Sequence, residues 1–333
     1  MPRRLHPTFC LKEAMSKSPP ADDQSEEAPD LFSLMDRSSL PVTSRRVIES
    51  SAQIRESPPE RADFLHAVLC QVGMPRKQSK TRVFERSSGT VSMRLEAGTL
   101  FQRGKFVDQP LPYGTRPRLV MVHISGEAVR TGSREVRIGD SMREFLITLS
   151  IEPSGGPRGG YTMFKKQMEA LAASRLTLGM SVRSRDVTIN TQPISRFEAW
   201  LTHDGKQRGL WPGVMELSQE FYDTLTAHAV PLDHRALGAL KHSALALDIY
   251  TWLAHRLCRI KKPEGVMVSW GNMRDQFGQE YSDPKNFKRK FRQAMREVCA
   301  VYPHARIEDT NGGLILHSSK PPIAKTSVLV GAG

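Results

Sequence analysis

Apolar and polar positions change their rhythm along the chain, and each change marks an expected element. Apolar residues recur at helical spacing between Phe64 and Leu69, and Gly73 and Pro75 end that pattern, which predicts a helix there. Residues 90–95 alternate as a strand does. Beyond residue 117 the pattern predicts, in order, a helix at 118–129, a strand at 134–138, a helix capped by Asp140 or Ser141, a helix at 161–176 and strands between 176 and 202.

The second half of the chain repeats this order of elements with different residues. The pattern predicts a long apolar helix at 235–260, a strand at 268–270, a short helix at 272–278, a helix from residue 284, and strands at 305–309 and 314–318 joined through Asn311 and Gly312. Helix, strand, helix, helix and hairpin is the order of the winged helix, whose third helix enters the major groove while its hairpin contacts the neighbouring backbone. The predicted fold class is therefore α+β, with two tandem winged-helix domains docked through residues 204–232.

Serine, proline and acidic residues dominate the first 60 positions, which lack the apolar surface needed to fold and are expected to form a disordered tail. A short apolar island at 30–35, DLFSLM, is of the kind that docks on a partner. The resulting prediction divides the chain into a tail at 1–60, an N-terminal winged-helix domain at 61–217 for dimerisation and auxiliary DNA contact, a C-terminal DNA-binding winged-helix domain at 218–318 and a flexible tail at 319–333.

Charge and cysteine content narrow the class of partner and the compartment. The chain carries 48 Lys and Arg against 35 Asp and Glu, a net charge of +13 that favours a polyanion such as nucleic acid or a membrane surface. No apolar run is long enough to span a bilayer and the first residues do not resemble a signal peptide, so a soluble, cytoplasmic protein without membrane attachment is expected. The four cysteines show no paired spacing, which predicts free thiols.

The helix predicted from Pro284, with the sequence PKNFKRKFRQAMREV, has the sharpest segregation of charge in the chain. Its apolar residues form one stripe, while its basic residues gather on the opposite face with no acidic residue four positions away. A basic helix face is in most proteins simply solvated. Here it falls at the position of a recognition helix, and this favours contact with nucleic acid.

Roles within this helix follow from side-chain chemistry. Arginine offers paired donors to guanine, asparagine and glutamine pair with adenine, and lysine suits phosphates. In the hairpin, Arg306 and His317 are candidates for backbone contact. The predicted DNA-binding residues are Lys285, Asn286, Lys288, Arg289, Arg292, Gln293, Arg296 and Arg306. The corresponding helix of the first half carries Lys165, Lys166 and Arg175 diluted by Glu169, so the main contact is assigned to the second half.

Signatures of catalysis are missing from the sequence. The glycine-rich stretch at 155–160 lacks the Lys-Ser or Lys-Thr of a phosphate-binding loop, and no HExxH motif occurs. Glu308 and Asp309 are neighbours on a predicted strand, where their side chains point to opposite faces and are unable to share a metal. No catalytic residue, metal or cofactor is expected, and a non-enzymatic protein is predicted.

Three long segments, at 111–146, 230–257 and 283–303, resemble the plasmid-encoded RepA replication initiator family. The resemblance implies a protein that binds repeated double-stranded sites in a plasmid origin, opens the DNA and recruits host replication proteins such as the replicative helicase and the host initiator. It also implies two winged helices, the first involved in dimer contacts, with monomers that start replication and homodimers that repress their own gene. The DLFSLM island faintly resembles a sliding-clamp docking motif.

Three other classes stay open at this point. A transcriptional repressor would use the same helices without initiator activity, and would prefer an inverted repeat to tandem repeats. A primase or nickase with an unrecognised site would make a magnesium-dependent product. An interaction module would direct its basic face at an acidic protein and bind no duplex.

Overall fold

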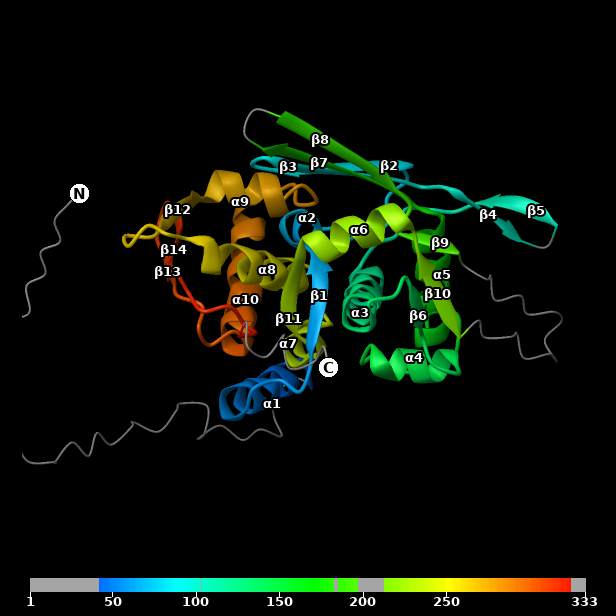
Figure 1. The fold of residues 1–333 in the computed structure, drawn as a ribbon. Helices are drawn as coiled ribbons and strands as arrows, with labels where there is room; N and C mark the ends of the chain where they lie inside the picture. The colour runs from blue at the N-terminus through cyan, green and yellow to red at the C-terminus, as the bar shows by residue number, and fades with distance from the viewer. Residues whose placement is uncertain (1–41, 103, 183–184, 197–212, 325–333) are drawn as a thin grey trace, which may run out of the picture. The chain divides into compact units, whose positions relative to one another are not determined.

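A computed structural model describes residues 42–102, 104–182, 185–196 and 213–324, and shows a mixed fold of helices and strands (Figure 1). This confirms the mixed class predicted from the sequence, while the predicted division into two winged-helix domains stays a prediction. The elements of the first half are α1 (Val42–Glu56), β1 (Ala62–His66), α2 (Ala67–Gln71), β2 (Val83–Ser88), β3 (Val91–Glu96), β4 (Thr99–Gln102), β5 (Lys105–Asp108), α3 (Thr115–Thr131), β6 (Glu135–Arg137), α4 (Met142–Thr148), α5 (Gly160–Ala173), β7 (Arg175–Val182), β8 (Arg185–Thr191) and β9 (Ile194–Arg196).

From residue 244 onward, the second half follows the order of elements predicted from the sequence. Its elements are β10 (Val214–Leu217), α6 (Gln219–Ala227), β11 (Ala229–Asp233), α7 (His234–Leu240), α8 (Ala244–Arg256), a 3-10 turn (Leu257–Arg259), β12 (Val266–Ser269), α9 (Trp270–Phe277), α10 (Pro284–Val301), β13 (Ile307–Asp309) and β14 (Gly313–Leu316). Strands β12, β14 and β13 form an antiparallel sheet in that order, with the predicted hairpin at its edge.

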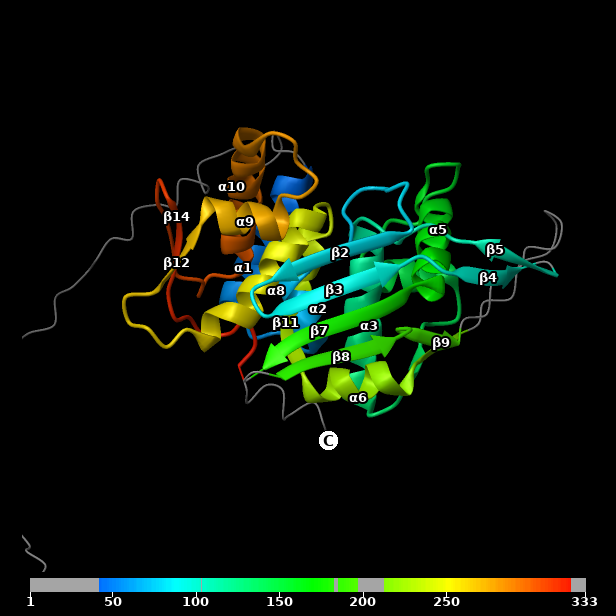
Figure 2. The ribbon, with the colours of Figure 1, turned by 90° about the horizontal axis from the view of Figure 1, so that it is seen from above.

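The two halves share an order of elements but differ in how their strands pair. In the first half the hairpin β7–β8 joins β3 and β2 in a four-stranded antiparallel sheet, whose strands lie side by side in Figure 2. The short strand β6 pairs instead with β10, which also pairs with β9. Alternation on β3 explains the sheet's orientation, because Val91, Met93 and Leu95 are buried while the residues between them are exposed.

Four local expectations are wrong. The helix expected at 61–72 is strand β1 followed by the short α2, because β1 pairs with β11 and Phe64 and Leu65 are buried in that pairing. The tail expected to end at residue 60 contains α1, which contacts α7 and α10. Residues 1–41, with DLFSLM, lie outside the described residues.

Two of the four wrong expectations concern the second half of the chain. The long helix expected at 235–260 is broken before Ser243, whose hydroxyl accepts a hydrogen bond from the Ala246 N–H at 3.2 Å at the start of α8. The flexible tail expected from residue 319 does not hold for residues 319–324, where Ile323 is buried.

The pairing of β1 with β11 places a histidine in the interior. The His66 Nδ1 accepts a hydrogen bond from the Val68 N–H at 3.1 Å, and its Nε2 lies 3.0 Å from the Thr224 hydroxyl. Since Nδ1 accepts, the proton of the neutral ring is on Nε2 and is donated to Thr224. Burial, and then the neighbouring His228, lower the pKa of His66 to about 4.

Acid should therefore destabilise the folded chain through His66. In the unfolded chain this ring takes up a proton near its ordinary pKa of 6.5, while the folded ring stays neutral until about pH 4. The free energy of unfolding is expected to fall by up to about 3 kcal/mol between these two values. Urea denaturation at neutral pH and near pH 4.5 measures the fall, and His66→Gln should lose this part of it. Burial also lowers the pKa of His255 to about 4, so the stability of His66→Gln keeps some pH dependence. If His66→Gln shows the same pH dependence of stability as the wild-type protein, the prediction is contradicted.

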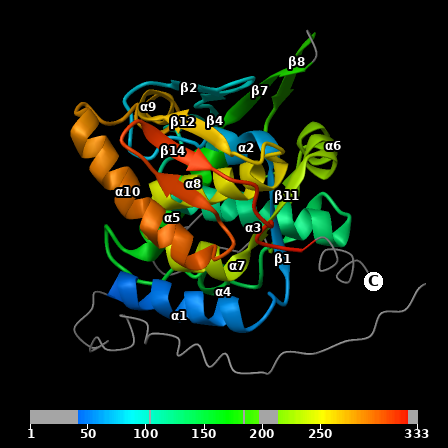
Figure 3. The same ribbon diagram turned by 90° about the vertical axis from the view of Figure 1, so that its left-hand side faces the viewer.

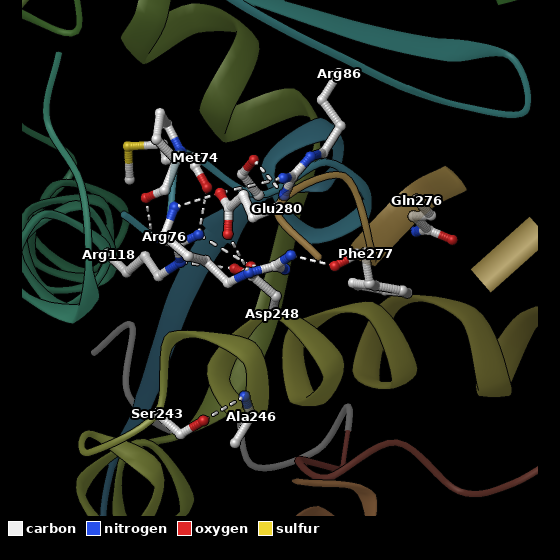
Figure 4. Close-up of polar contacts among 12 residues, drawn as sticks. Met74, Arg76, Arg86, Arg118, Ser243, Ala246, Asp248, Gln276, Phe277 and Glu280 are labelled. Carbon is white, nitrogen blue, oxygen red and sulfur yellow. Dashed lines mark hydrogen bonds and ion pairs between the residues drawn. The ribbon is translucent and has the colours of Figure 1, made fainter. Parts of the chain in front are cut away.

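A buried cluster of charges joins the first half of the chain to α8 and to the loop before α10 (Figure 4). Arg118 on α3 donates from Nε and Nη2 to the two carboxylate oxygens of Asp248 on α8, at 2.7 and 2.9 Å. Arg76 donates from its backbone N–H and its Nε to the two oxygens of Glu280, at 2.8 and 3.0 Å, and from Nη1 to Asp248 at 3.3 Å. Two carboxylates and two arginines thus link four chain segments in the interior.

A third arginine of this cluster, Arg86 on β2, is fully buried as a side chain. Its Nη1 donates to the Gly73 carbonyl at 3.1 Å, and its Nη2 lies 3.7 Å from Glu280. Burial, the largest influence, and the like charges of its arginine neighbours lower the pKa of Arg86 to about 10. Glu280 stands three residues before Asp283, the residue that caps the start of α10, so the cluster anchors the segment that leads into the helix with the candidate site.

Candidate nucleic-acid interface

Helix α10 begins and packs as the sequence predicts. The Asp283 carboxylate accepts from the backbone N–H groups of Lys285 and Asn286 at 2.9 and 3.0 Å, and Pro284 occupies the first helical position. One face of the helix is buried against α8, α7 and α1, through Phe287, Phe291, Ala294, Met295, Val298 and Val301. Figure 3 shows α10 along one side of the molecule, next to the strands β12 and β14.

The opposite face of α10 forms a shallow hollow lined by basic side chains. The five residues that line it are Lys285, Lys288, Arg289, Arg292 and Arg296. Lys285, Arg289 and Arg296 are exposed, whereas Lys288 and Arg292 are half-buried. The structure therefore brings together the five cations that the sequence placed on one face. Because five positive charges converge on one surface, the hollow favours an anionic ligand with several charges.

Arg292 has an acidic partner that the helix alone did not reveal. Its Nε and Nη2 bind the two oxygens of Asp309 on β13, each at 2.6 Å. This hydrogen bonding raises the pKa of Arg292 above its ordinary value. No acidic residue lies four positions away along α10, but the hairpin supplies one from 17 residues downstream. The neighbouring Glu308 points to the other face of the strand, where it lies 2.8 Å from the His317 Nε2, as strand alternation predicts.

Trp270, at the start of α9, lies beneath two of these cations. The Lys288 ammonium is 4.7 Å and the Arg292 guanidinium 5.1 Å from the centre of the Trp270 ring. The indole N–H donates to the Thr310 carbonyl at 3.4 Å, and the ring meets Phe291 edge-on. The apolar surroundings of the tryptophans in the sequence predict that they are core residues. This prediction is confirmed for Trp252, which is buried, whereas Trp270 is only half-buried and also contacts two cations of the hollow.

The other predicted contact residues differ in how free they are. The Arg289 Nη2 donates to the Asn286 side-chain oxygen at 2.9 Å, so these two neighbours form a pair on the exposed surface. Gln293 and Arg306 are exposed. His317, expected to contact backbone, is engaged by Glu308 and mostly buried as a side chain. At the far end of α10, Glu297 lies 3.0 Å from the His242 Nε2, and this hydrogen bond raises the pKa of His242.

Basic residues of the first half are less concentrated. Lys165 on α5 lies 4.0 Å from Glu169, four positions along the same helix, while Lys166 and Arg175 are exposed. Burial raises the pKa of Glu169, and Lys165 opposes that shift. On the hairpin β7–β8 and on β9, Arg185 and Arg196 are exposed. Basic side chains are therefore more concentrated on α10 than on α5, and the assignment of the main DNA contact to the second half stays a prediction.

Neither a metal centre nor a membrane helix is found in the part of the chain that the structure describes. Within residues 42–102, 104–182, 185–196 and 213–324, no three His, Cys, Asp or Glu residues gather as metal ligands would. None of the helices in these ranges is both long and apolar enough to cross a bilayer. Cys70, Cys258 and Cys299 are free thiols, as expected, and Cys10 lies outside the described residues.

The fold and this surface together define a basic protein of helices and small antiparallel sheets, with five basic residues gathered on one face of α10. A family model described as plasmid encoded RepA protein matches residues 111–272, from just before α3 into α9. This match confirms the resemblance to the RepA replication initiator family that the sequence shows at 111–146 and 230–257. The match ends before α10. Neither the curated proteins nor the solved structures give a match to the chain.

Proposed function

We propose that this protein is a plasmid replication initiator that binds repeated double-stranded DNA sites through α10. The match of residues 111–272 to the family model of plasmid encoded RepA protein supports a role in plasmid replication. The observation that carries the DNA contact is the hollow on α10, which is lined by five basic residues. Phosphates would take up most of these charges, and a smaller number of base contacts would provide specificity.

The order and pairing of the second-half elements support a winged-helix interpretation of this site. Helix α8, strand β12, helices α9 and α10, and the hairpin β13–β14 follow the order of that fold, and β12 joins the hairpin in one sheet. In this interpretation α10 is the third helix, which lies in the major groove, and Arg306 approaches the backbone beside it. The first half would then supply dimer contacts and auxiliary DNA contacts.

Initiation implies further steps beyond binding. We propose that the bound protein promotes local opening of the origin and recruits host replication proteins such as the replicative helicase and the host initiator. Monomers would start replication and homodimers would repress the protein's own gene. All of these steps are binding events, so the proposed function is non-enzymatic.

Direct binding tests this function. Fluorescence anisotropy with duplexes from the DNA flanking the coding sequence, and with scrambled duplexes of the same composition, should show tight binding only to the repeats. Arg292→Ala is expected to weaken repeat binding by about tenfold or more, since a paired arginine–guanine contact contributes about 1–3 kcal/mol of discrimination. Equal binding of both duplexes by the wild-type protein contradicts the proposal.

The arrangement of the preferred sites separates the initiator from a plain repressor. An initiator should prefer tandem direct repeats and make the adjacent AT-rich DNA sensitive to a single-strand-specific probe. A dimeric repressor should prefer an inverted repeat and leave the neighbouring duplex closed.

A further inference from the structure

Arg292 is restrained on its edge and on its face. Asp309 binds one edge of the guanidinium through Nε and Nη2, both at 2.6 Å. Trp270 lies under its plane, 5.1 Å from ring centre to guanidinium carbon. Trp270 is itself tied to the hairpin through the Thr310 carbonyl. The side chain thus has less of the rotamer freedom that a solvated arginine keeps.

The donors left over on Arg292 are the ones that a guanine needs. An arginine carries five N–H donors in a rigid planar fork. The contact with Asp309 uses the Nε edge and leaves the two terminal nitrogens with free hydrogens at the outer end. Two parallel donors at that end match the O6 and N7 acceptors of guanine in the major groove.

The position of Asp309 shows which side of the arginine it holds. Arg292 is one of the five residues that line the hollow on α10, and the lining contains no acidic residue. The carboxylate therefore approaches Arg292 from the hairpin side, outside the surface that a ligand would occupy. An acidic residue that blocked the hollow would be among the residues that line it.

We propose that Asp309 is a positioning residue that fixes Arg292 to read a single guanine, so that specificity at one base pair depends on a carboxylate that does not touch the DNA. This inference rests on the proposed function. Because the guanidinium is fixed before binding, Arg292 loses less conformational entropy when the complex forms. The resulting gain in affinity is largest for DNA sites in which the outer donors of Arg292 meet a guanine. Phosphate contacts elsewhere on α10 do not require a side chain whose orientation is fixed in this way.

The opposite interpretation makes Asp309 a competitor that keeps Arg292 from DNA. The two interpretations predict opposite signs for one substitution. If Asp309 positions Arg292, Asp309→Ala lowers the preference for the selected site over scrambled DNA. If Asp309 competes with DNA, Asp309→Ala strengthens binding to the selected site and leaves that preference intact.

Selection from a pool of duplexes with a randomised central stretch distinguishes these outcomes. The full-length wild-type protein, Arg292→Ala, Asp309→Ala and Asp309→Asn would each be used to select and sequence bound duplexes, after circular dichroism has verified their folding. Glu308→Ala is the matched control, because it removes an equal charge one residue away that faces His317 instead of Arg292.

The expected result is that wild type selects a motif with one guanine that Arg292→Ala no longer selects. Asp309→Ala should lose the same guanine, with a fall in preference of about tenfold, while Glu308→Ala keeps it. In the double variant Arg292→Ala with Asp309→Ala, the loss should equal that of Arg292→Ala alone. The inference is overturned, and the proposed function kept, if Asp309→Ala retains the guanine or binds it more tightly. If the wild-type protein selects no sequence at all, the proposed function fails and the inference with it.

Discussion

Asp248→Asn is expected to lower the free energy of unfolding by about 3–5 kcal/mol, because it leaves buried arginines without half of their compensating charge. The substitution keeps the shape of the side chain and removes its charge. The amide oxygen of Asn accepts hydrogen bonds but carries no charge, so Arg118 would lose two charge-assisted bonds and keep at most one neutral acceptor here, and Arg76 would lose one charge-assisted bond. Glu280 would then be the sole carboxylate facing the three arginines of the cluster. A large effect from an isosteric change would show that the charge holds the two halves together.

Urea denaturation followed by tryptophan fluorescence measures this destabilisation, since Trp252 lies buried on the same helix as Asp248. Asp309→Asn is the matched control: its pair with Arg292 is partly exposed, and its removal is expected to cost under about 1 kcal/mol. Equal destabilisation in the two variants would mean that burial does not increase the cost of removing a charge from the cluster. Replacing Asp248 and Arg118 together by apolar residues should cost less than Asp248→Asn alone.

Removing the three exposed cations of the hollow should nearly abolish binding to duplex DNA. The variant Lys285→Ala, Arg289→Ala, Arg296→Ala keeps the buried stripe of α10 and the Arg292 pair. Removal of one phosphate contact lowers the slope of log affinity against log salt by about 0.9, so removal of three lowers it by about 2.7. At about 0.1 M salt the affinity should fall by between two and three orders of magnitude, whatever the DNA sequence.

An exposed lysine on the same helix provides the control for this experiment. Lys290 carries the same charge but does not line the hollow, so Lys290→Ala should leave the salt slope unchanged. If Lys290→Ala and the triple variant change the slope in proportion to the charge removed, binding depends on net charge alone and the hollow is not the specific DNA-binding surface. If neither changes it, the duplex binds elsewhere.

Elements whose causes are local could be predicted from the sequence. Asp283, Pro284 and the stripe of Phe287, Phe291 and Ala294 lie within a few turns of one another, and each supports the same helix. Ser141 is likewise one of the two caps that the sequence offers for α4, and its hydroxyl accepts from the Glu144 N–H at 3.1 Å. Propensity, capping and periodicity all act over such distances.

Features made by distant partners could not be predicted in this way. Phe64 and Leu65 have the spacing of a helix, and only the pairing with β11 makes them a strand. The contact of Asp309 with Arg292 depends on how the hairpin folds back on α10, and in the sequence Asp309 is merely one of two neighbouring acids. The five cations of the hollow could be found because they share one helix; their acidic and aromatic partners could not, because they come from β13 and α9.

The pairing of β1 with β11 also has a consequence for how the chain is made. A ribosome releases β1 about 160 residues before β11, which at about 5–20 residues per second amounts to roughly ten to thirty seconds. Throughout that interval the nascent β1 has an unpaired edge, and Arg76, Arg86 and Arg118 emerge before either Asp248 or Glu280 exists to neutralise them. The first half is therefore unable to reach its final packing until β11, Asp248 and Glu280 have been made. A truncated product that ends before residue 229 is expected to be a substrate for chaperones and proteases.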